Sequence, residues 1–327
     1  MTENIENPAP YKTVGVVGAG AWGTALALVA AQAGRRVTLW AREREVTHEL
    51  RASHRNERYL PGVTLPAAIT ATSNIAAMAD CDAILIVVPA QHLREILPEM
   101  PGRIPLVLCA KGIERTTGKL LPEVLAEAAS NAVPAILSGP SFARDVSLGL
   151  PTAVTIAARM DVALRLQATL GHATFRPYAS DDLTGVALGG AAKNVYAIAC
   201  GIVDGMGLGE SARAALIARS FAELTRLGAA LGARPDTLMG LAGLGDLVLT
   251  ATSATSRNFS YGRALGQGRT PEGALAEGVE TAPALVKRAR AEKVELPIAE
   301  AVARVLDGTL SVSEAVLSLM SRPLKPE

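Results

Sequence analysis

A single lysine in an apolar, Ala- and Gly-rich helical stretch is the residue of this chain best suited to proton transfer. Residues 188–199 read LGGAAKNVYAIA, and Lys193 is the only charged side chain among them. Because apolar surroundings disfavour an ammonium ion, such a lysine is either paired with a carboxylate or lowered in pKa, and both states serve a proton-transfer catalyst. A buried structural ion pair is the alternative interpretation.

A second apolar stretch offers a partner for this lysine. Residues 240–250 read GLAGLGDLVLT, and Asp246 is their only charged side chain. An unpaired buried carboxylate is costly, so Asp246 needs a cation close to it. We therefore predict an ion pair between Lys193 and Asp246.

Several polar segments have the residue types that bind an anionic substrate. Lys111 follows an expected strand in CAKGI (109–113), although an ordinary surface lysine is the alternative. Residues 252–259, TSATSRNF, bring hydroxyls, Arg257 and Asn258 to an expected helix start. This set can bind a phosphate through the guanidinium, short polar donors and a helix N-terminus, or it is simply a capped polar loop.

Two other segments are less specific. The turn SGPSFA (138–143) exposes backbone N–H groups at a strand end, and alone it is more typical of a plain turn. Residues 275–281, LAEGVET, precede another expected helix and offer a carboxylate to a cofactor, while capping or solvation is equally compatible. Spacing does not choose between Glu277 and Glu280.

Residues 18–23, GAGAWG, form a GxGxxG element between an expected buried strand, 13–17, and a helix that extends to Gln32. In a dinucleotide site Gly18 permits the tight turn, Gly20 lets the backbone approach a pyrophosphate, and Gly23 lets the helix lie close to the strand. The helix N-terminus then faces the phosphates. The context favours a dinucleotide site over a Gly-rich structural turn.

The residues that follow the next expected strand, 36–40, indicate whether NAD or NADP binds. An NAD-specific unit has an acidic residue about 20 positions beyond the glycines. This chain instead reads LWARER at 39–44, which places Arg42 where a guanidinium can meet a 2′-phosphate. Glu43 complicates the assignment, and Arg42 stacked on adenine or in solvent is the alternative. The sequence favours NADP and leaves room for NAD as well.

Two kinds of pattern divide the chain. Up to residue 182, strands alternate with helices, which predicts a Rossmann-like doubly wound parallel sheet; from 183 to 327 helical periodicity dominates and predicts an all-helical C-terminal domain. Ser73 is a plausible helix cap. The expected strands are 13–17, 36–40, 69–72, 83–88, 106–109, 135–137 and 153–156. The expected C-terminal helices are 189–202, 210–230, 261–265 and beyond, 282–292, 298–306 and 313–320.

Composition narrows the functional classes. Among 327 residues, 32 Lys and Arg balance 31 Asp and Glu, so no broad field attracts nucleic acid or an anionic membrane. The apolar run 83–88 is far shorter than the ~20 residues of a membrane span, and residues 1–10 lack the pattern of a signal peptide. The cysteines predict buried thiols in a reducing compartment, and neither they nor the histidines have the spacing of a metal site.

Six motifs in this order resemble one enzyme family: GAGAWGTALA, CAKGIE, LSGPSFA, LGGAAKNVYAIA, GLAGLGDLVLT and TSRN. They resemble the bacterial NAD(P)-dependent sn-glycerol-3-phosphate dehydrogenases, from about Thr13 to beyond Gly278. The resemblance implies a cytoplasmic oxidoreductase that reversibly reduces dihydroxyacetone phosphate to sn-glycerol 3-phosphate for phospholipid synthesis. It also implies NADP and NAD as cofactors.

The resemblance assigns roles to residues at the matching positions. Lys193 corresponds to the proton donor and acceptor. The substrate-site positions are Lys111, Gly139, Ser141, Lys193, Asp246, Ser256, Arg257 and Asn258. The cofactor-side positions are Gly18, Gly20, Ala21, Trp22, Gly23, Arg42, Lys111, Ala143, Arg257, Leu275 and Glu277. Two departures are Ala21, where relatives often have Ser, and Leu275-Ala276, where they often have two valines.

Two other functions remain compatible with the sequence. A related dehydrogenase of a 2-hydroxy or 3-hydroxy acid would use Arg257 to bind a carboxylate. A non-catalytic nucleotide-sensing module is a different class, against which the lone charges at 193 and 246 argue. The expected partners are a small-molecule substrate and, for the Ala-rich helical domain, a second copy in a homodimer, without nucleic acid or a membrane span.

Overall fold

The computed structural model describes residues 8–271, 276–321 and 323, and it divides into two compact units. The sheet unit contains residues 1–110 and 121–186, and the helical unit contains 111–120 and 187–327. The sequence-based division at 182/183 had placed 111–120 with the sheet. Its contacts group this segment, which includes Lys111, with the helices instead.

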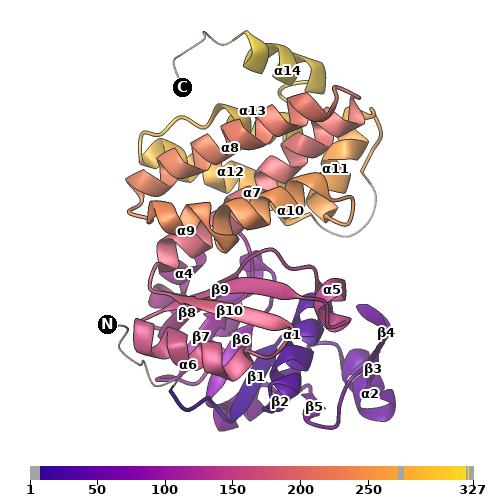
Figure 1. The fold of residues 1–327 in the computed structure, drawn as a ribbon, viewed down its shortest axis with the longest axis vertical. Coiled ribbons are helices and arrows are strands. Elements are labelled where there is room, and N and C mark those ends of the chain that lie inside the picture. The colour runs from indigo at the N-terminus through magenta and orange to yellow at the C-terminus, as the bar shows by residue number, and fades with distance from the viewer. Residues whose placement is uncertain (1–7, 272–275, 322, 324–327) are drawn as a thin grey trace. The chain divides into compact units, whose positions relative to one another are not determined.

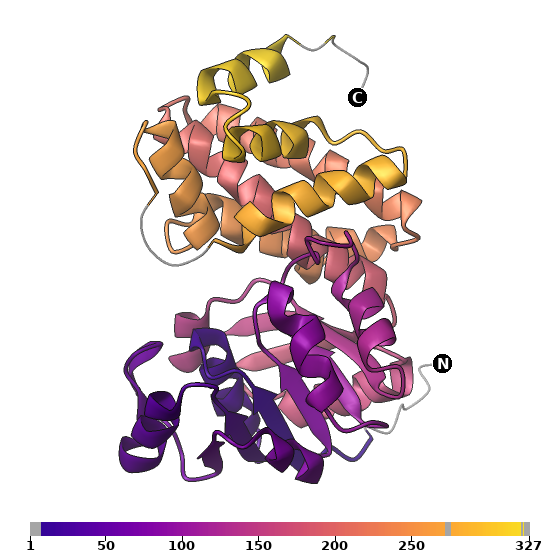
Figure 2. The same cartoon turned by 180° about the vertical axis from the view of Figure 1, so that it is seen from behind.

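An eight-stranded sheet forms the centre of the sheet unit, in the order β10-β9-β8-β7-β6-β1-β2-β5. Helices α1 and α6 cover one face (Figure 1), and α3 and α4 cover the other (Figure 2). The inner strands are almost wholly buried and apolar, as expected of parallel strands covered on both sides. The strands are β1 (Thr13–Val17), β2 (Arg36–Trp40), β5 (Ile69–Thr72), β6 (Ala83–Ile86), β7 (Pro105–Leu108), β8 (Val133–Ser138), β9 (Thr152–Ala158) and β10 (Phe175–Ser180).

The sheet confirms the predicted fold class and departs from it in one place, because β8 and β9 pair antiparallel. The connection between them contains only the short helix α5 (Ala143–Ser147) and lacks the crossover helix that a parallel return needs. Strand β10, which sequence reasoning missed, pairs parallel to β9 at the sheet edge. Its Pro177 makes the pattern unlike a strand, yet proline is tolerated at an edge.

The remaining elements of the sheet unit are short or peripheral. A small hairpin joins β3 (Arg55–Asn56) to β4 (Leu60–Thr64). The 3₁₀ helix η1 (Ile75–Asp80) is capped by the side chain of Asn74, which accepts from Ala76 N at 3.1 Å, and not by Ser73 as predicted. The helices are α1 (Ala21–Gln32), α2 (Arg44–Ser53), η2 (Ala90–His92), α3 (Leu93–Ile96), η3 (Leu97–Glu99), α4 (Leu121–Ala128) and α6 (Met160–Leu170).

Helix α7 (Leu183–Gly205) is the central element of the helical unit. Its residues from Val186 to Val203 are buried throughout. The other elements are α8 (Glu210–Ala230), α9 (Pro235–Met239), the π-helical turn η4 (Leu241–Gly245), α10 (Asp246–Thr252), α11 (Arg257–Gly266), α12 (Glu277–Ala291), α13 (Pro297–Leu306) and α14 (Val312–Met320).

Glycines let α11 approach α7 closely. A side chain at Gly201 would overlap the carbonyl oxygen of Phe259, and one at Gly262 would overlap that of Ile198. The two backbones therefore meet at a seam of small residues. This approach brings the start of α11, with its polar residues, next to the middle of α7.

Helix α7 is also the one helix in the described part of the chain that is alone long and apolar enough to cross a membrane. The bent pair 235–252 and 257–266 passes the same test only when its helices are counted together. Since 94% of the apolar window of α7 is buried in the protein, its composition is that of a core helix. The three cysteines, Cys81, Cys109 and Cys200, are buried thiols, as predicted.

Candidate active site

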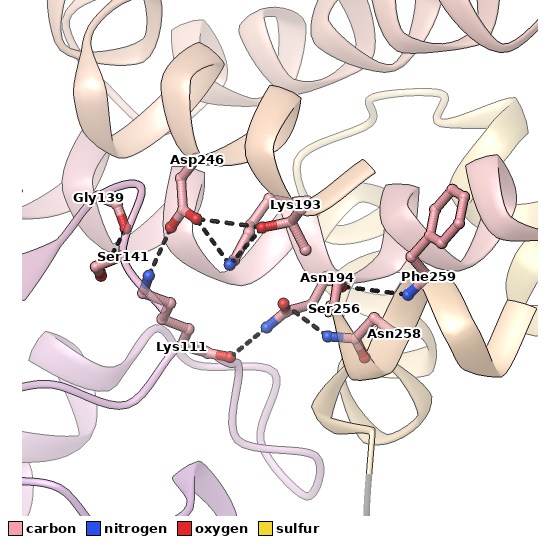
Figure 3. A network of polar contacts seen from close by, with 10 residues as sticks. Lys111, Gly139, Ser141, Lys193, Asn194, Asp246, Ser256, Asn258 and Phe259 are labelled. Carbon is pink, nitrogen blue, oxygen red and sulfur yellow. Dashed lines mark hydrogen bonds and ion pairs between the residues drawn. The ribbon is translucent and has the colours of Figure 1, made fainter. Parts of the chain in front are cut away.

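Two lysines share one carboxylate at the centre of the candidate site. Lys193 Nζ lies 2.8 Å from Asp246 Oδ1, and Lys111 Nζ lies 2.7 Å from Asp246 Oδ2 (Figure 3). The exposed fractions of these side chains are 9% for Lys193, 12% for Lys111 and 1% for Asp246. The predicted pair of Lys193 with Asp246 is present. The second ion pair, between Lys111 and the same carboxylate, was not predicted.

The backbone around Asp246 explains how the carboxylate reaches α7. Asp246 is the first residue of α10, directly after the π-helical turn η4. A side chain at Gly243 would overlap the carbonyl oxygen of Leu238, and one at Gly189 would overlap that of Ala242. Gly189 thus allows the turn to pack against α7, one helical turn before Lys193, and Gly243 allows the turn to approach the end of α9.

The surroundings of Lys193 bring its pKa close to neutral pH, where an amine can serve as a proton donor and acceptor. Burial is the largest influence and lowers the pKa of Lys193 to about 8, helped by the charge of Lys111 and opposed by Asp246. Burial alone would raise the pKa of Asp246, but the two lysines outweigh it and the pKa is lowered. Near neutral pH the carboxylate is therefore ionised, while Lys193 can both give and take a proton.

Thr250 is a second partner of Lys193, and sequence reasoning missed it. Lys193 Nζ donates to Thr250 Oγ1 at 2.8 Å, and Thr250 Oγ1 donates to Asp246 Oδ1 at 3.2 Å. An ammonium has three N–H donors, and these contacts with Asp246 and Thr250 use two of them. The available signal was the spacing of four between Asp246 and Thr250, which puts both on one face of a helix.

A chain of amide contacts runs beside the lysines. Asn194 Nδ2 donates to the carbonyl oxygen of Lys111 at 3.0 Å, and Asn258 Nδ2 donates to Asn194 Oδ1 at 2.8 Å (Figure 3). Asn258 Oδ1 in turn accepts from Gly278 N at 2.9 Å. Asn258, predicted to hold a substrate phosphate, is thus buried in a link between α7, α11 and α12. Asn194 was not singled out, because only packing shows its role.

The start of α11 combines a cap with an exposed cation. Ser256 Oγ accepts from Phe259 N at 3.3 Å, so this serine is the N-cap of the helix (Figure 3). Arg257, the first helical residue, is exposed. Ser256 therefore caps the helix, as the alternative interpretation of this segment expects, and Arg257 beside it is exposed.

The two glutamates that spacing left undecided have different surroundings. Burial raises the pKa of Glu277, against the lowering effect of Arg257, Lys193 and Lys111, so its carboxyl lies within the electrostatic reach of the candidate site. Glu280 Oε2 instead pairs with Arg115 Nη1 at 2.9 Å. Glu277 is the one near the lysines. Leu275 lies outside the described residues.

The glycine loop of the sheet unit fits each expected task. Gly18 has φ +111°, in the region that favours glycine, and a side chain at Gly23 would overlap the carbonyl oxygen of Gly18. A Cβ built on Gly20 meets no described atom within 4 Å, which leaves space for a ligand at the N-terminus of α1. Ala21 and Trp22 begin that helix. These residues fit the pyrophosphate of a dinucleotide.

The other predicted positions of the sheet unit follow strand ends. Arg42 comes after β2 and is exposed. Gly139 has φ +150°, and a Cβ there would lie 2.8 Å from Val154 Cα. Ser141 Oγ donates to the carbonyl oxygen of Gly139 at 3.1 Å, and Ala143 begins α5. The turn therefore requires glycine at 139.

Two family models together match most of the chain. Residues 13–163 match the N-terminus, and residues 182–317 the C-terminus, of NAD-dependent glycerol-3-phosphate dehydrogenase. Proteins named glycerol-3-phosphate dehydrogenase [NAD(P)+] are similar over nearly the whole length: one from Parvibaculum lavamentivorans is 56% identical, over 97% of this chain and 98% of that protein. The chain belongs to this family. A relative from Bradyrhizobium sp. (strain ORS 278) is 57% identical, with the same coverage.

Solved structures agree with this membership. Glycerol-3-phosphate dehydrogenase from Coxiella burnetii is 38% identical with a TM-score of 0.90, covering 96% of this chain and 100% of that one. A ketopantoate reductase from Ralstonia eutropha has a TM-score of 0.58 at 14% identity, covering 93% of this chain and 99% of that one. The second likeness shows a shared fold alone.

Proposed function

We propose that this chain is an NAD(P)-dependent sn-glycerol-3-phosphate dehydrogenase, which interconverts dihydroxyacetone phosphate and sn-glycerol 3-phosphate. The observation that carries the proposal is the buried carboxylate of Asp246 with Lys193 on one oxygen and Lys111 on the other. The names of the relatives and the glycine loop support the same activity. Through its product the enzyme would serve phospholipid synthesis.

Lys193 is the proposed proton donor in the direction of ketone reduction. The nicotinamide, when bound, supplies the hydride that reduces the C2 carbonyl. The ammonium of Lys193 gives its proton to the oxygen that becomes the hydroxyl, and in the reverse direction the neutral amine takes that proton back. Asp246 and Thr250 orient Nζ through two contacts, so that the remaining N–H can face the substrate. Lys111 adds positive charge that favours an anionic substrate.

The substrate phosphate is proposed to bind at the start of α11. Arg257 offers an exposed guanidinium, and Ser256 and Asn258 fix the backbone that carries it. Asn258 also keeps a second amide N–H that the contact with Asn194 does not use. Gly139 and Ser141 complete the proposed substrate positions.

The proposed cofactors are NADP and NAD. Gly18, Gly20, Ala21, Trp22 and Gly23 would hold the pyrophosphate at the start of α1, where unpaired N–H groups favour an anion. Arg42 is the proposed ligand of a 2′-phosphate. Lys111, Ala143, Arg257, Leu275 and Glu277 are the other proposed positions on the cofactor side.

Replacing Arg257 with alanine is expected to raise KM for dihydroxyacetone phosphate by about tenfold to a hundredfold, as for a lost hydrogen bond to a charged group. The measurement is NADPH oxidation at varied substrate concentration. Arg263→Ala, on the same helix but paired with Asp204, is the matched control. An unchanged KM in Arg257→Ala would remove the phosphate role. Faster turnover of a carboxylated ketone than of the phosphate would favour a hydroxy-acid dehydrogenase.

We also propose that the enzyme works in the cytoplasm as a homodimer. Three buried thiols support a reducing compartment, which fractionation of cells would test. A mostly apolar groove of about 1270 Å³ lies between α8, α13 and α14, and Leu317 and Met320 on α14 are 69% and 79% exposed. Light scattering should give twice the chain mass of 33.8 kDa, and a monomer mass would contradict the dimer.

A further inference from the structure

The segment 111–120 is a closed loop that begins with Lys111. Ile113 and Leu120 form an isolated antiparallel bridge, and both are buried. Glu114 N donates to the carbonyl oxygen of Lys119 at 3.0 Å, and Gly118 N donates to that of Glu114 at 2.8 Å. The loop is therefore a small rigid body, and whatever fixes its far end also fixes the position of Lys111.

That far end is attached to helix α12 by two contacts. Arg115 Nη1 lies 2.9 Å from Glu280 Oε2, and Lys287 Nζ donates to the carbonyl oxygen of Thr116 at 2.7 Å. Glu280 and Lys287 are seven residues apart, which puts them on one face of α12, two turns from each other. Gly118 lies against the side chain of Lys287, where a Cβ would be 3.6 Å from Lys287 Cδ.

The near end of the loop is held by the amide of Asn194, which donates to the carbonyl oxygen of Lys111. A lysine side chain is long and flexible, so a contact with the backbone does not by itself keep Nζ on Asp246. The loop must also be prevented from tilting about that contact. The contacts of Arg115 and Lys287 with α12 do this.

We infer that Arg115, Glu280 and Lys287 form a clamp that holds Lys111 on the carboxylate of Asp246. They are positioning residues, since they act on the site only through Lys111. The inference rests on the proposed function, because it concerns how that site is set. It also gives Glu280 a role distinct from that of Glu277.

Opening the clamp has a consequence that a purely structural contact lacks. The charge of Lys111 lowers the pKa of Lys193, and Lys111 shares the carboxylate that stabilises the ammonium of Lys193. If Lys111 moves away, both effects raise the pKa of Lys193. Ketone reduction needs the protonated amine, so the fall in activity with rising pH should move to higher pH. Substrate binding should weaken as well, because one cation has left the site.

A charge exchange tests the clamp. In Arg115→Glu and in Glu280→Arg, like charges face each other, whereas the double variant restores an opposite pair. Each single variant is expected to raise KM for dihydroxyacetone phosphate by about threefold to tenfold and to move the basic limb of kcat/KM upward by about half a pH unit. The double variant should return both quantities towards wild type. Lys287→Met removes the second contact and should act in the same direction.

Arg290→Glu is the matched control, because Arg290 is on α12 and pairs with Glu300 at 3.7 Å, outside the clamp. It should move neither KM nor the pH limb. Hydrogen exchange of the peptide 111–120, read by mass spectrometry, gives a readout without turnover: protection should fall in Arg115→Glu and recover in the double variant.

These measurements test the proposed function and the clamp separately. If the wild type does not reduce dihydroxyacetone phosphate, the proposed function fails, and loss of the clamp still appears in hydrogen exchange. If the wild type is active but Arg115→Glu and Lys287→Met keep wild-type KM, pH limb and protection, the clamp is overturned. A fall in kcat without a shifted limb, unrepaired by the double variant, would also overturn it.

Discussion

Replacing Lys193 with alanine is expected to lower kcat for the reduction of dihydroxyacetone phosphate by about a hundredfold to ten-thousandfold, the usual contribution of a positioned proton donor. Binding of NADPH should survive, because Lys193 is not among the proposed cofactor positions and the proposed pyrophosphate residues lie on the glycine loop of the sheet unit. Steady-state kinetics and a fluorescence titration with NADPH measure the two quantities. Lys12→Ala, a change at an exposed lysine of the sheet unit, is the control.

The pH dependence of the activity should also identify Lys193 as the proton donor. Its pKa is lowered to about 8, so ketone reduction, which needs the ammonium, should be constant below that pH and fall above it. Oxidation of sn-glycerol 3-phosphate needs the neutral amine and should rise through the same pH. Both limbs should be absent from the residual activity of Lys193→Ala. Near wild-type turnover in that variant would refute the assignment.

Replacing Asp246 with asparagine is expected to damage both stability and catalysis. The change keeps the side-chain volume but leaves the ammonium groups of Lys111 and Lys193 without the carboxylate between them. Breaking a buried ion pair on one side costs about 3–5 kcal/mol in the free energy of unfolding, although deprotonation of Lys193 relieves part of this cost. The variant should therefore have a lowered pKa at Lys193 and too little ammonium for reduction at neutral pH.

Urea unfolding and kcat together measure this result. Asp236→Asn, at an exposed carboxylate on α9, is the matched control and should change the free energy of unfolding by less than about 0.5 kcal/mol. An Asp246→Asn enzyme as stable and as active as wild type would contradict a central role for the carboxylate. Full activity in a destabilised variant would reduce Asp246 to a structural residue.

The ion pair of Lys193 and Asp246 could be predicted from the sequence for a simple physical reason. Each is the only charge of a long apolar segment, and a buried charge needs an opposite one. The glycine loop was predictable because backbone geometry at Gly18 and close packing at Gly23 are local requirements. In these cases the local sequence alone is enough to predict the interaction or the turn.

Other parts of the site depend on packing that no local pattern contains. Lys111 reaches Asp246 because its loop folds onto the helical unit, whereas the alternation of strands had assigned that loop to the sheet. Asn194 and Thr250 are ordinary polar residues until α7, α10 and α11 meet. Asn258 is predicted from the sequence at the substrate phosphate, and only the fold shows that its amide also joins Asn194 to the start of α12.

The same limit applies to the fold. The alternation of apolar strands and helices was enough to predict a Rossmann-like sheet followed by helices. It did not contain the antiparallel pairing of β8 with β9, which follows from the short connection between them. It also missed β10, because Pro177 breaks the pattern and only the position at the sheet edge makes it tolerable.

Oxidation of NADPH by the purified protein in the presence of dihydroxyacetone phosphate, with NADH in parallel, tests the proposed function most directly. Consumption of NADPH should depend on dihydroxyacetone phosphate. Its rate should fall steeply in Lys193→Ala, and KM for dihydroxyacetone phosphate should rise in Arg257→Ala. If the protein binds NADPH but consumes none with this substrate, the proposal is contradicted and the chain is a nucleotide-binding module without the dehydrogenase activity.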